Sequence, residues 1–156
     1  MDPESLTRWT CLGLLVARWA AQRRLETLNQ QHVEQHRAEP PEAVRDVMAP
    51  ESYARSVDYT LAKSRLRRLE LSWDTVLLLI LLLSGVLPWS YTTAQSIAPP
   101  GPATAAAWLI VVGLVFSLFN LPFGWYEQFR LEERFGFNTT TPRIWWTDRV
   151  KGAVLG

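Results

Sequence analysis

This sequence of 156 residues contains few of the side chains that build metal centres and covalent cross-links. Its single cysteine, Cys11, excludes a disulfide within the chain and any zinc cluster made of several cysteines. It has two histidines, His32 and His36. The net charge of +1, without a concentrated basic face, gives no support for nucleic-acid binding.

Charge is also missing from one long stretch of the chain. No charged side chain occurs between Asp74 and Glu127, whereas Arg23 to Glu70 is dense in charges of both signs. Several of the eight tryptophans flank apolar runs, where an interfacial aromatic belt is expected: Trp73, Trp89, Trp108, Trp125, Trp145 and Trp146. This segregation is typical of an integral membrane protein, whose first partner is the lipid bilayer.

Apolar runs predict where the chain crosses the membrane. The predicted spans are about 6–21, 73–91, 103–123 and the start of a further one at about 144–156. A bilayer needs roughly 20 apolar residues, and the second run nearly supplies them. The first run carries Arg8 and Arg18, but its acidic start and poor cleavage site favour a retained helix over a signal peptide. The predicted fold class is therefore all-α integral membrane, with long membrane-spanning helices and cytoplasmic extensions, roughly three spans plus the start of a fourth.

Polar segments extend these helices out of the membrane. No helix breaker follows the first run until Pro40-Pro41, which predicts a polar stalk, and a second helix can begin at Pro50 and run to Gly85. Segment 22–72 is rich in lysine and arginine, whereas the turn 92–104 has neither. We therefore expect segments 22–72 and 124–143 to be cytoplasmic and the amino terminus to lie outside.

The stretch "HVEQH" is close to the zinc-protease motif H-E-x-x-H. On a helix His32 and His36 share a face, but Glu34 lies about 200° round from His32 and points away from any metal held by the pair. No third ligand is near in sequence, so a solvated polar face is the favoured interpretation. A zinc site shared between two chains stays open, and metal retention lost in His32→Ala would reveal it.

A dense motif lies between Leu121 and Arg143, "LPFGWYEQFRLEERFGFNTTTPR". It resembles the CAAX prenyl protease 1 family of integral-membrane zinc metalloendopeptidases, in its bacterial branch. The matching residues are Pro122, Tyr126, Phe129, Glu132, Glu133, Arg134, Phe135, Gly136, Phe137, Asn138, Thr141 and Pro142. The blocks "LNQQHVEQHR" and "PPEAVRDVMAPESYARSVDYTLAKSRL" resemble the amino-terminal region of the same family.

The resemblance implies that residues 1–156 are the amino-terminal membrane region of such a protease, placed in a bacterial inner membrane. In that family H-E-x-x-H and the later glutamate ligand lie in the carboxyl-terminal half. The resemblance therefore implies no catalytic residue, metal ligand or cofactor in this chain, with zinc expected in the full-length parent. It also implies that the chain is inactive alone, that its partner is the missing carboxyl-terminal half, and that the parent's substrates are prenylated or membrane-associated proteins. The chain stops within an apolar pattern at Gly156, which favours a fragment over the alternative, a short non-catalytic membrane scaffold or interaction protein.

The motif itself predicts a structural turn. Gly136 and Asn138 permit a tight turn, including positive φ. The pair Glu132-Glu133 and Arg134 could form ion pairs with the basic segment 22–72. Metal binding by the two adjacent carboxylates is disfavoured, because successive helical residues diverge. Lys63, Arg65, Arg67 and Arg68 are interpreted either as a topology signal or as a site that attracts anionic lipid head groups.

Overall fold

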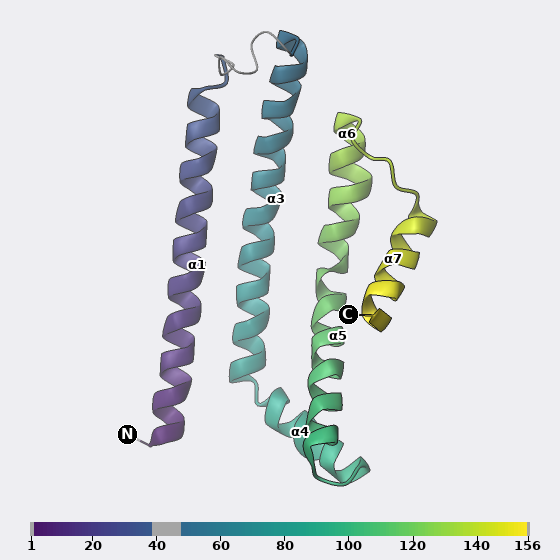
Figure 1. Cartoon of the computed structure of the whole chain (residues 1–156). Helices are drawn as coiled ribbons and strands as arrows, with labels where there is room; N and C mark the ends of the chain where they lie inside the picture. Colours follow the sequence, from purple (N-terminus) through teal and green to yellow (C-terminus); the bar gives the residue numbers. More distant parts are fainter. Residues whose placement is uncertain (1, 39–47, 156) are drawn as a thin grey trace.

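The computed structural model describes residues 2–38 and 48–155, most of which lie in helices (Figure 1). The elements are α1 (Pro3–Gln35), α3 (Pro50–Leu83), α4 (Val86–Ile97), α5 (Pro102–Tyr126), the π-helical turn η1 (Glu127–Glu132), α6 (Glu133–Phe135) and α7 (Pro142–Leu155). Across these described ranges there is no strand. The predicted all-α class is confirmed.

Two long antiparallel helices, α1 and α3, lie side by side (Figure 1). Both begin at a proline, Pro3 and Pro50. Proline suits the first helical turn because it lacks a backbone N–H, and an N–H at that position would have no hydrogen-bond partner within the helix. An acidic residue follows each proline and favours the positive end of the helix dipole. The continuity of the first helix to Gln35 and the start of the next at Pro50 are confirmed, and the place where the first helix leaves the membrane stays a prediction. The predicted break at Pro40-Pro41 lies outside the described residues.

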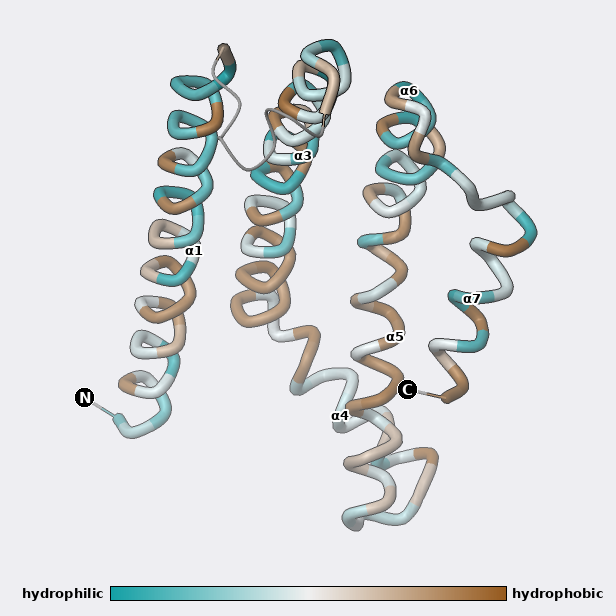
Figure 2. Tube along the Cα trace, turned by 45° about the horizontal axis from the view of Figure 1, so that its top comes forward, coloured by the Kyte–Doolittle hydropathy of each residue, from teal (hydrophilic) through white to brown (hydrophobic). Residues whose placement is uncertain are grey.

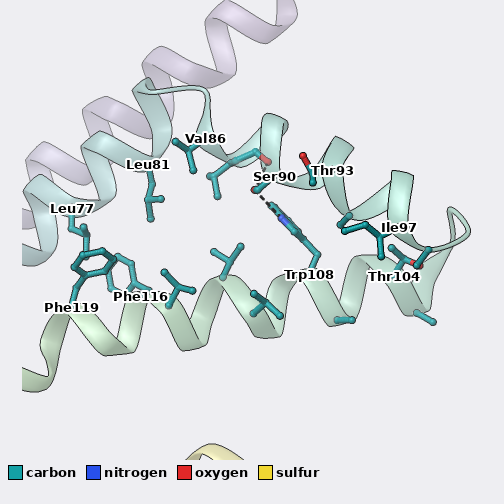
Figure 3. A pocket seen from close by; sticks show the side chains of 18 residues that line it. Leu77, Leu81, Val86, Ser90, Thr93, Ile97, Thr104, Trp108, Phe116 and Phe119 are labelled. Atoms are coloured by element: carbon teal, nitrogen blue, oxygen red, sulfur yellow. Dashed lines mark hydrogen bonds between the residues drawn. The ribbon is translucent and has the colours of Figure 1, made fainter.

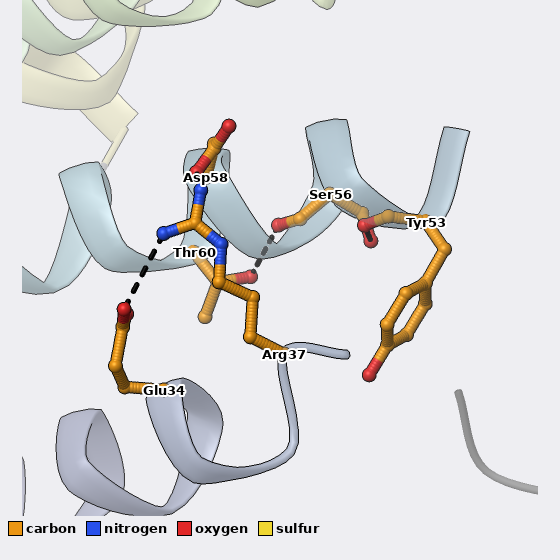
Figure 4. Close-up of polar contacts among 6 residues, drawn as sticks. All are labelled: Glu34, Arg37, Tyr53, Ser56, Asp58 and Thr60. Carbon is orange, nitrogen blue, oxygen red and sulfur yellow. Dashed lines mark hydrogen bonds and ion pairs between the residues drawn. The ribbon is translucent and has the colours of Figure 1, made fainter. Parts of the chain in front are cut away.

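Polar contacts hold α1 against α3. The hydroxyl of Ser64 donates to Glu26 Oε1 at 2.5 Å, and Arg23 Nη1 donates to Ser72 Oγ at 3.1 Å. At the far end Arg37 lies 2.6 Å from Asp58 Oδ1 and 3.3 Å from Glu34 Oε1 (Figure 4). The two helices are therefore joined by hydrogen bonds and one ion pair, Arg37–Asp58, along the part of the chain that sequence predicts to leave the membrane.

The predicted span 73–91 is not one straight helix. The chain ends α3 at Leu83 and resumes as α4 at Val86, with the two helices bent by 61°. Gly85 has φ 72°, a left-handed conformation that interrupts the helical hydrogen-bond ladder. Apolar composition does not reveal this bend, because hydropathy reports burial preference and not backbone direction.

The stretch from α5 through α6, Pro102–Phe135, is long and apolar enough to cross a membrane. The bent pair α3–α4 passes the same test when counted as one span, and no other described helix does. Figure 2 shows the hydrophobic colouring running through α5 and the neighbouring end of α3, with hydrophilic residues gathered towards α6 and the far end of α1. The prediction 103–123 thus falls within one apolar helix, whereas the span 6–21 stays a prediction.

The buried residues all lie in what we call the charged half, residues 22–38, 48–72 and 124–149. They are Val57, Leu61, Ser64, Leu66, Leu131 and Trp145. In the apolar half, residues 73–123, no side chain is buried. There an open groove of about 640 Å³ separates α3 and α4 from α5, and Trp108 Nε1 donates to Ser90 Oγ at 3.0 Å on its wall (Figure 3).

Candidate functional site

The family-like motif begins with an irregular helix. Pro122 lies inside α5 and the chain widens into a π turn at Glu127–Glu132. Five residues in a regular α-helix would set Glu127 and Glu132 about 140° apart, whereas about one π turn brings them back to one face. Both carboxylates consequently reach α3, at Lys63 and Tyr59. Single π turns inside α-helices are often found at functional sites.

An ion pair links the π turn to α3. Lys63 Nζ lies 2.7 Å from Glu127 Oε1, with the two side chains 46% and 30% exposed. The same ammonium donates to the Tyr59 hydroxyl at 3.4 Å. The hydrogen bond to Glu127 raises the pKa of Lys63 above its ordinary value, although partial burial acts in the opposite direction. Lys63 therefore stays charged at neutral pH and fixes the start of η1.

Tyr59 lies at the centre of the contact between α3 and the end of α6. Its ring packs edge-on against Phe135 at 5.5 Å and Phe137 at 4.8 Å between centroids. Its hydroxyl contacts Glu132 Oε1 at 3.5 Å, a long hydrogen bond. Edge-to-face aromatic pairs contribute about 0.5–1.5 kcal/mol each beyond the burial of area. We call this arrangement of Tyr59, Lys63, Glu127, Glu132, Phe135 and Phe137 the aromatic lock.

A glycine and an asparagine shape the turn that follows. Gly136 has φ 79° and ψ 20°, the left-handed conformation that ends a helix, and the Phe137 amide donates to the Glu132 carbonyl at 2.9 Å. Asn138 acts differently from expectation, since no non-glycine residue described here has positive φ. Its Oδ1 accepts the Thr140 amide and Gln128 Nε2, each at 2.9 Å. The side chain of Asn138, and not its backbone, closes the turn.

The last helix packs back on the same segment. Thr141 Oγ1 accepts the Ile144 amide at 3.4 Å, and Pro142 occupies the first turn of α7. This capping directs Trp145, 6% exposed, onto Trp125 at 5.3 Å and Phe129 at 6.3 Å. The Arg149 guanidinium covers the Trp145 ring at 4.8 Å. We call Trp125, Phe129 and Trp145, with Arg149 over the Trp145 ring, the aromatic cluster.

With this geometry in place, comparison with known proteins identifies the chain. The family described as "CAAX prenyl protease N-terminal, five membrane helices" matches residues 29–156. The chain belongs to this CAAX prenyl protease family. It is thus the amino-terminal membrane region of that family, as the motif between Leu121 and Arg143 indicates.

Individual relatives agree with this assignment. CAAX prenyl protease 1 of Saccharomyces cerevisiae is 34% identical over 74 residues, which cover 47% of this chain and 15% of the yeast protein. The Caenorhabditis elegans homolog of CAAX prenyl protease 1 is 23% identical over 130 residues, covering 83% of this chain and 28% of the worm protein. The crystal structure of S. mikatae Ste24p has the same fold, with a TM-score of 0.76 at 24% identity, over 99% of this chain and 36% of that one. The chain therefore spans about a third or less of the length of these proteins.

The structure brings most of the motif together, but not by the ion pairs that sequence suggests. Glu132 contacts Tyr59 and Gln128, while Glu133 and Arg134 are exposed and make no ion pair within the described ranges. The carboxylate that pairs with the basic segment is Glu127, which sequence reasoning missed. In an α-helical register Glu127 and Glu132 lie about 140° apart, so the sequence pattern does not indicate that both carboxylates reach α3. Tyr59 was missed too, although Tyr59 and Lys63 lie four residues apart on one helical face.

Tyr126 also belongs to the motif, yet it takes no part in the aromatic lock. It is 53% exposed and lines a separate groove with Pro122. Phe129, in contrast, contacts Trp125 at 4.3 Å within the aromatic cluster.

The histidine pair does not fit the zinc centre that the family implies. His32 and His36 lie at the exposed end of α1 with ring centroids 4.3 Å apart, and His36 Nδ1 is 2.8 Å from the His32 carbonyl oxygen. That contact occupies one ring nitrogen with backbone. Within residues 2–38 and 48–155 there is no group of three or more His, Cys, Asp or Glu that could hold a metal ion.

A second electrostatic feature lies beside the aromatic lock. The pKa of Glu70 is raised from its ordinary value, first by burial and then by the negative charges of Glu127 and Asp74. Asp74 Oδ1 is buried without a hydrogen-bond partner among the described residues. Lys63 and Arg67 oppose the shift of Glu70 only in part. Burial and two neighbouring carboxylates thus disfavour the charged form of Glu70 near the junction of the charged and apolar halves.

Proposed function

We propose that this chain forms the chamber wall and the cytoplasmic support of a zinc-dependent membrane endopeptidase that cleaves prenylated or membrane-associated proteins. The match to the CAAX prenyl protease amino-terminal family over residues 29–156 carries the proposal. Zinc and the catalytic groups come from a carboxyl-terminal half, which is the chain's main protein partner. The likeness to Ste24p over 99% of this chain, with a TM-score of 0.76, supports the shared helical fold.

The exposed apolar helices support a role in building a wall. In the apolar half Leu109, Ile110 and Leu118 are each at least 60% exposed, so further helices or lipid must cover them. The aromatic lock and the aromatic cluster keep the polar ends of α3, α5 and α7 in fixed positions. A wall helix held at one end in this way presents its apolar length to neighbouring helices.

We place segments 22–72 and 124–143 in the cytoplasm and the amino terminus outside, in a bacterial inner membrane. The arginine and lysine content of 22–72, against none in 92–104, supports the orientation, and the resemblance of the motif to the family's bacterial branch motivates the choice of membrane. Single cysteines introduced as Asp2→Cys and Glu51→Cys, each in a Cys11→Ser background, test the orientation. In intact cells a membrane-impermeant maleimide should label the first and not the second, and the reverse pattern would invert the topology.

The decisive experiment captures the native product from membranes and measures its intact mass, its zinc content and its cleavage of a farnesylated peptide. We expect a mass well above the 17.8 kDa of this chain, one zinc per protein and cleavage abolished by a zinc chelator. The isolated chain should cleave nothing, because it lacks H-E-x-x-H. A native mass near 17.8 kDa without activity would overturn the proposal in favour of a short membrane scaffold.

A further inference from the structure

A groove of about 510 Å³ lies between α3 and the end of α5 with η1, next to the aromatic lock. Its charged lining consists of Arg65, Arg130 and Arg134, all three exposed. Its apolar lining includes Leu66, Leu69 and Phe123. The groove thus combines three guanidinium groups with a hydrocarbon surface.

The three arginines have no ion-pair partner within the described residues, although Asp58, which pairs with Arg37, lines a smaller adjoining cavity with Arg65 and Arg134. No aspartate or glutamate is among the described residues that line the groove. Lys63 and Arg37, in contrast, both have carboxylate partners. Three like charges around one cavity repel one another unless an anion neutralises them. Guanidinium groups suit a phosphate, which they bind with two parallel hydrogen bonds.

The apolar lining excludes a simple inorganic anion as the best fit. Leu69 is 63% exposed although it lines a cavity, so it needs an apolar cover. Phe123 lies 6.1 Å from Trp73 between ring centroids, at the boundary of the charged and apolar halves. From Phe123 the apolar surface continues along α5. A ligand with an anionic head and a hydrocarbon tail matches both parts of the groove.

We propose that this groove binds one anionic phospholipid. Its phosphate lies among Arg65, Arg130 and Arg134, and the part of an acyl chain nearest the head group lies along Leu66, Leu69 and Phe123. The lipid would bridge α3 and η1, the two elements that the Lys63–Glu127 ion pair also joins. Phe135 belongs both to the groove and to the aromatic lock. Lipid binding therefore stabilises the same junction, and it does so whether or not the parent is a protease.

The test uses the full chain at its native length, purified in detergent, and native mass spectrometry with dioleoylphosphatidylglycerol or dioleoylphosphatidylcholine. The groove variant is Arg65→Gln, Arg130→Gln and Arg134→Gln combined. The matched control is Arg55→Gln, Arg67→Gln and Arg143→Gln combined, which removes the same charge from exposed positions outside the groove. We expect one retained phosphatidylglycerol, with roughly fivefold weaker binding for each groove arginine removed and little change in the control.

Further arms separate the acyl chain from the head group. Leu69→Gln keeps the charge and should weaken phosphatidylglycerol binding, while glycerol 3-phosphate should compete poorly. Equal losses in the groove and control variants would overturn the proposal in favour of diffuse electrostatics. Full competition by glycerol 3-phosphate or by a phosphopeptide would also overturn it. If the triple variant fails to fold, Arg65→Gln against Arg67→Gln, both on α3, gives the same comparison.

Discussion

The charged and apolar halves of this chain differ in where their packing energy resides. In the charged half, leucine, valine and tryptophan side chains are buried, as at Leu61 and Trp145. In the apolar half, which is far richer in leucine, no side chain is buried. The comparison teaches that hydrophobic content alone does not make a core, because helices in a bilayer gain little from hiding leucine from lipid tails that are equally apolar.

Trp145→Ala should have the largest effect, since it removes the best-buried ring of the aromatic cluster. Loss of a buried tryptophan costs about 4 kcal/mol of unfolding free energy. Thermal unfolding in detergent micelles, followed by circular dichroism, measures it. Trp146→Ala is the matched control, because Trp146 is 49% exposed. Equal destabilisation by the two variants would contradict the view that the buried side chains of the charged half carry its packing energy.

The same contrast can be made with leucine. Leu61 is 8% exposed in the charged half and Leu118 is 60% exposed in the apolar half. Leu61→Ala should lower stability by about 3 kcal/mol, through lost burial and a cavity. Leu118→Ala should change it by about 0.5 kcal/mol or less when the chain is alone in detergent. A large cost at Leu118 would show that the apolar half has a core of its own.

Glycine-to-alanine substitutions should have the same effect on stability in both halves where the glycine has positive φ. Gly136 and Gly85 have positive φ, one in each half, so alanine costs about 1 kcal/mol at either position. Gly152→Ala is the control, because Gly152 lies inside α7 with open space around it, and alanine should stabilise that helix by about 1 kcal/mol. Chemical unfolding measures the change in unfolding free energy, and its sign, for each variant. Equal signs at Gly136 and Gly152 would contradict the left-handed turn.

The Lys63–Glu127 ion pair should contribute less than the rings around it. A double-mutant cycle with Lys63→Met and Glu127→Gln should give a coupling of about 0.5 kcal/mol, because both side chains are partly exposed. High salt should reduce the coupling. The pair Arg37–Glu34, whose side chains are more exposed on average, is a suitable control. Zero coupling energy at low salt would show that the ion pair contributes nothing to stability and that Tyr59 and its aromatic neighbours hold α3 against η1 without it.

The smallest effect is a pH dependence at Glu70. Its raised pKa means that the folded protein binds this proton more tightly than the unfolded chain. The resulting stabilisation is complete below the ordinary value of 4.5 and is lost as the pH rises through the raised pKa. Glu70→Gln should therefore raise the melting temperature more at pH 7 than at pH 4.5. An increase in melting temperature that is larger at pH 4.5 than at pH 7 would contradict the raised pKa of Glu70.

Sequence reasoning succeeded where a single local signal was sufficient. Pro50 marked the start of α3, and Gly136 marked a left-handed turn, since each residue restricts or permits one backbone conformation. It failed where two elements had to be placed together. Glu127 was missed because an α-helical register places it about 140° from Glu132, and only the π turn brings both carboxylates to α3. Asn138 was assigned a backbone role that its side chain performs instead.

The sequence by itself determined the all-helical class, the separation of charge from hydrocarbon, and the family, because these depend on composition, periodicity and a dense motif. Only the tertiary structure decided that the chain bends at Gly85 between α3 and α4, that the buried residues lie in the charged half, and that Tyr59 joins α3 to the motif. The physical reason is that bends, registers and aromatic contacts arise from the relative placement of helices, which one-dimensional patterns do not encode.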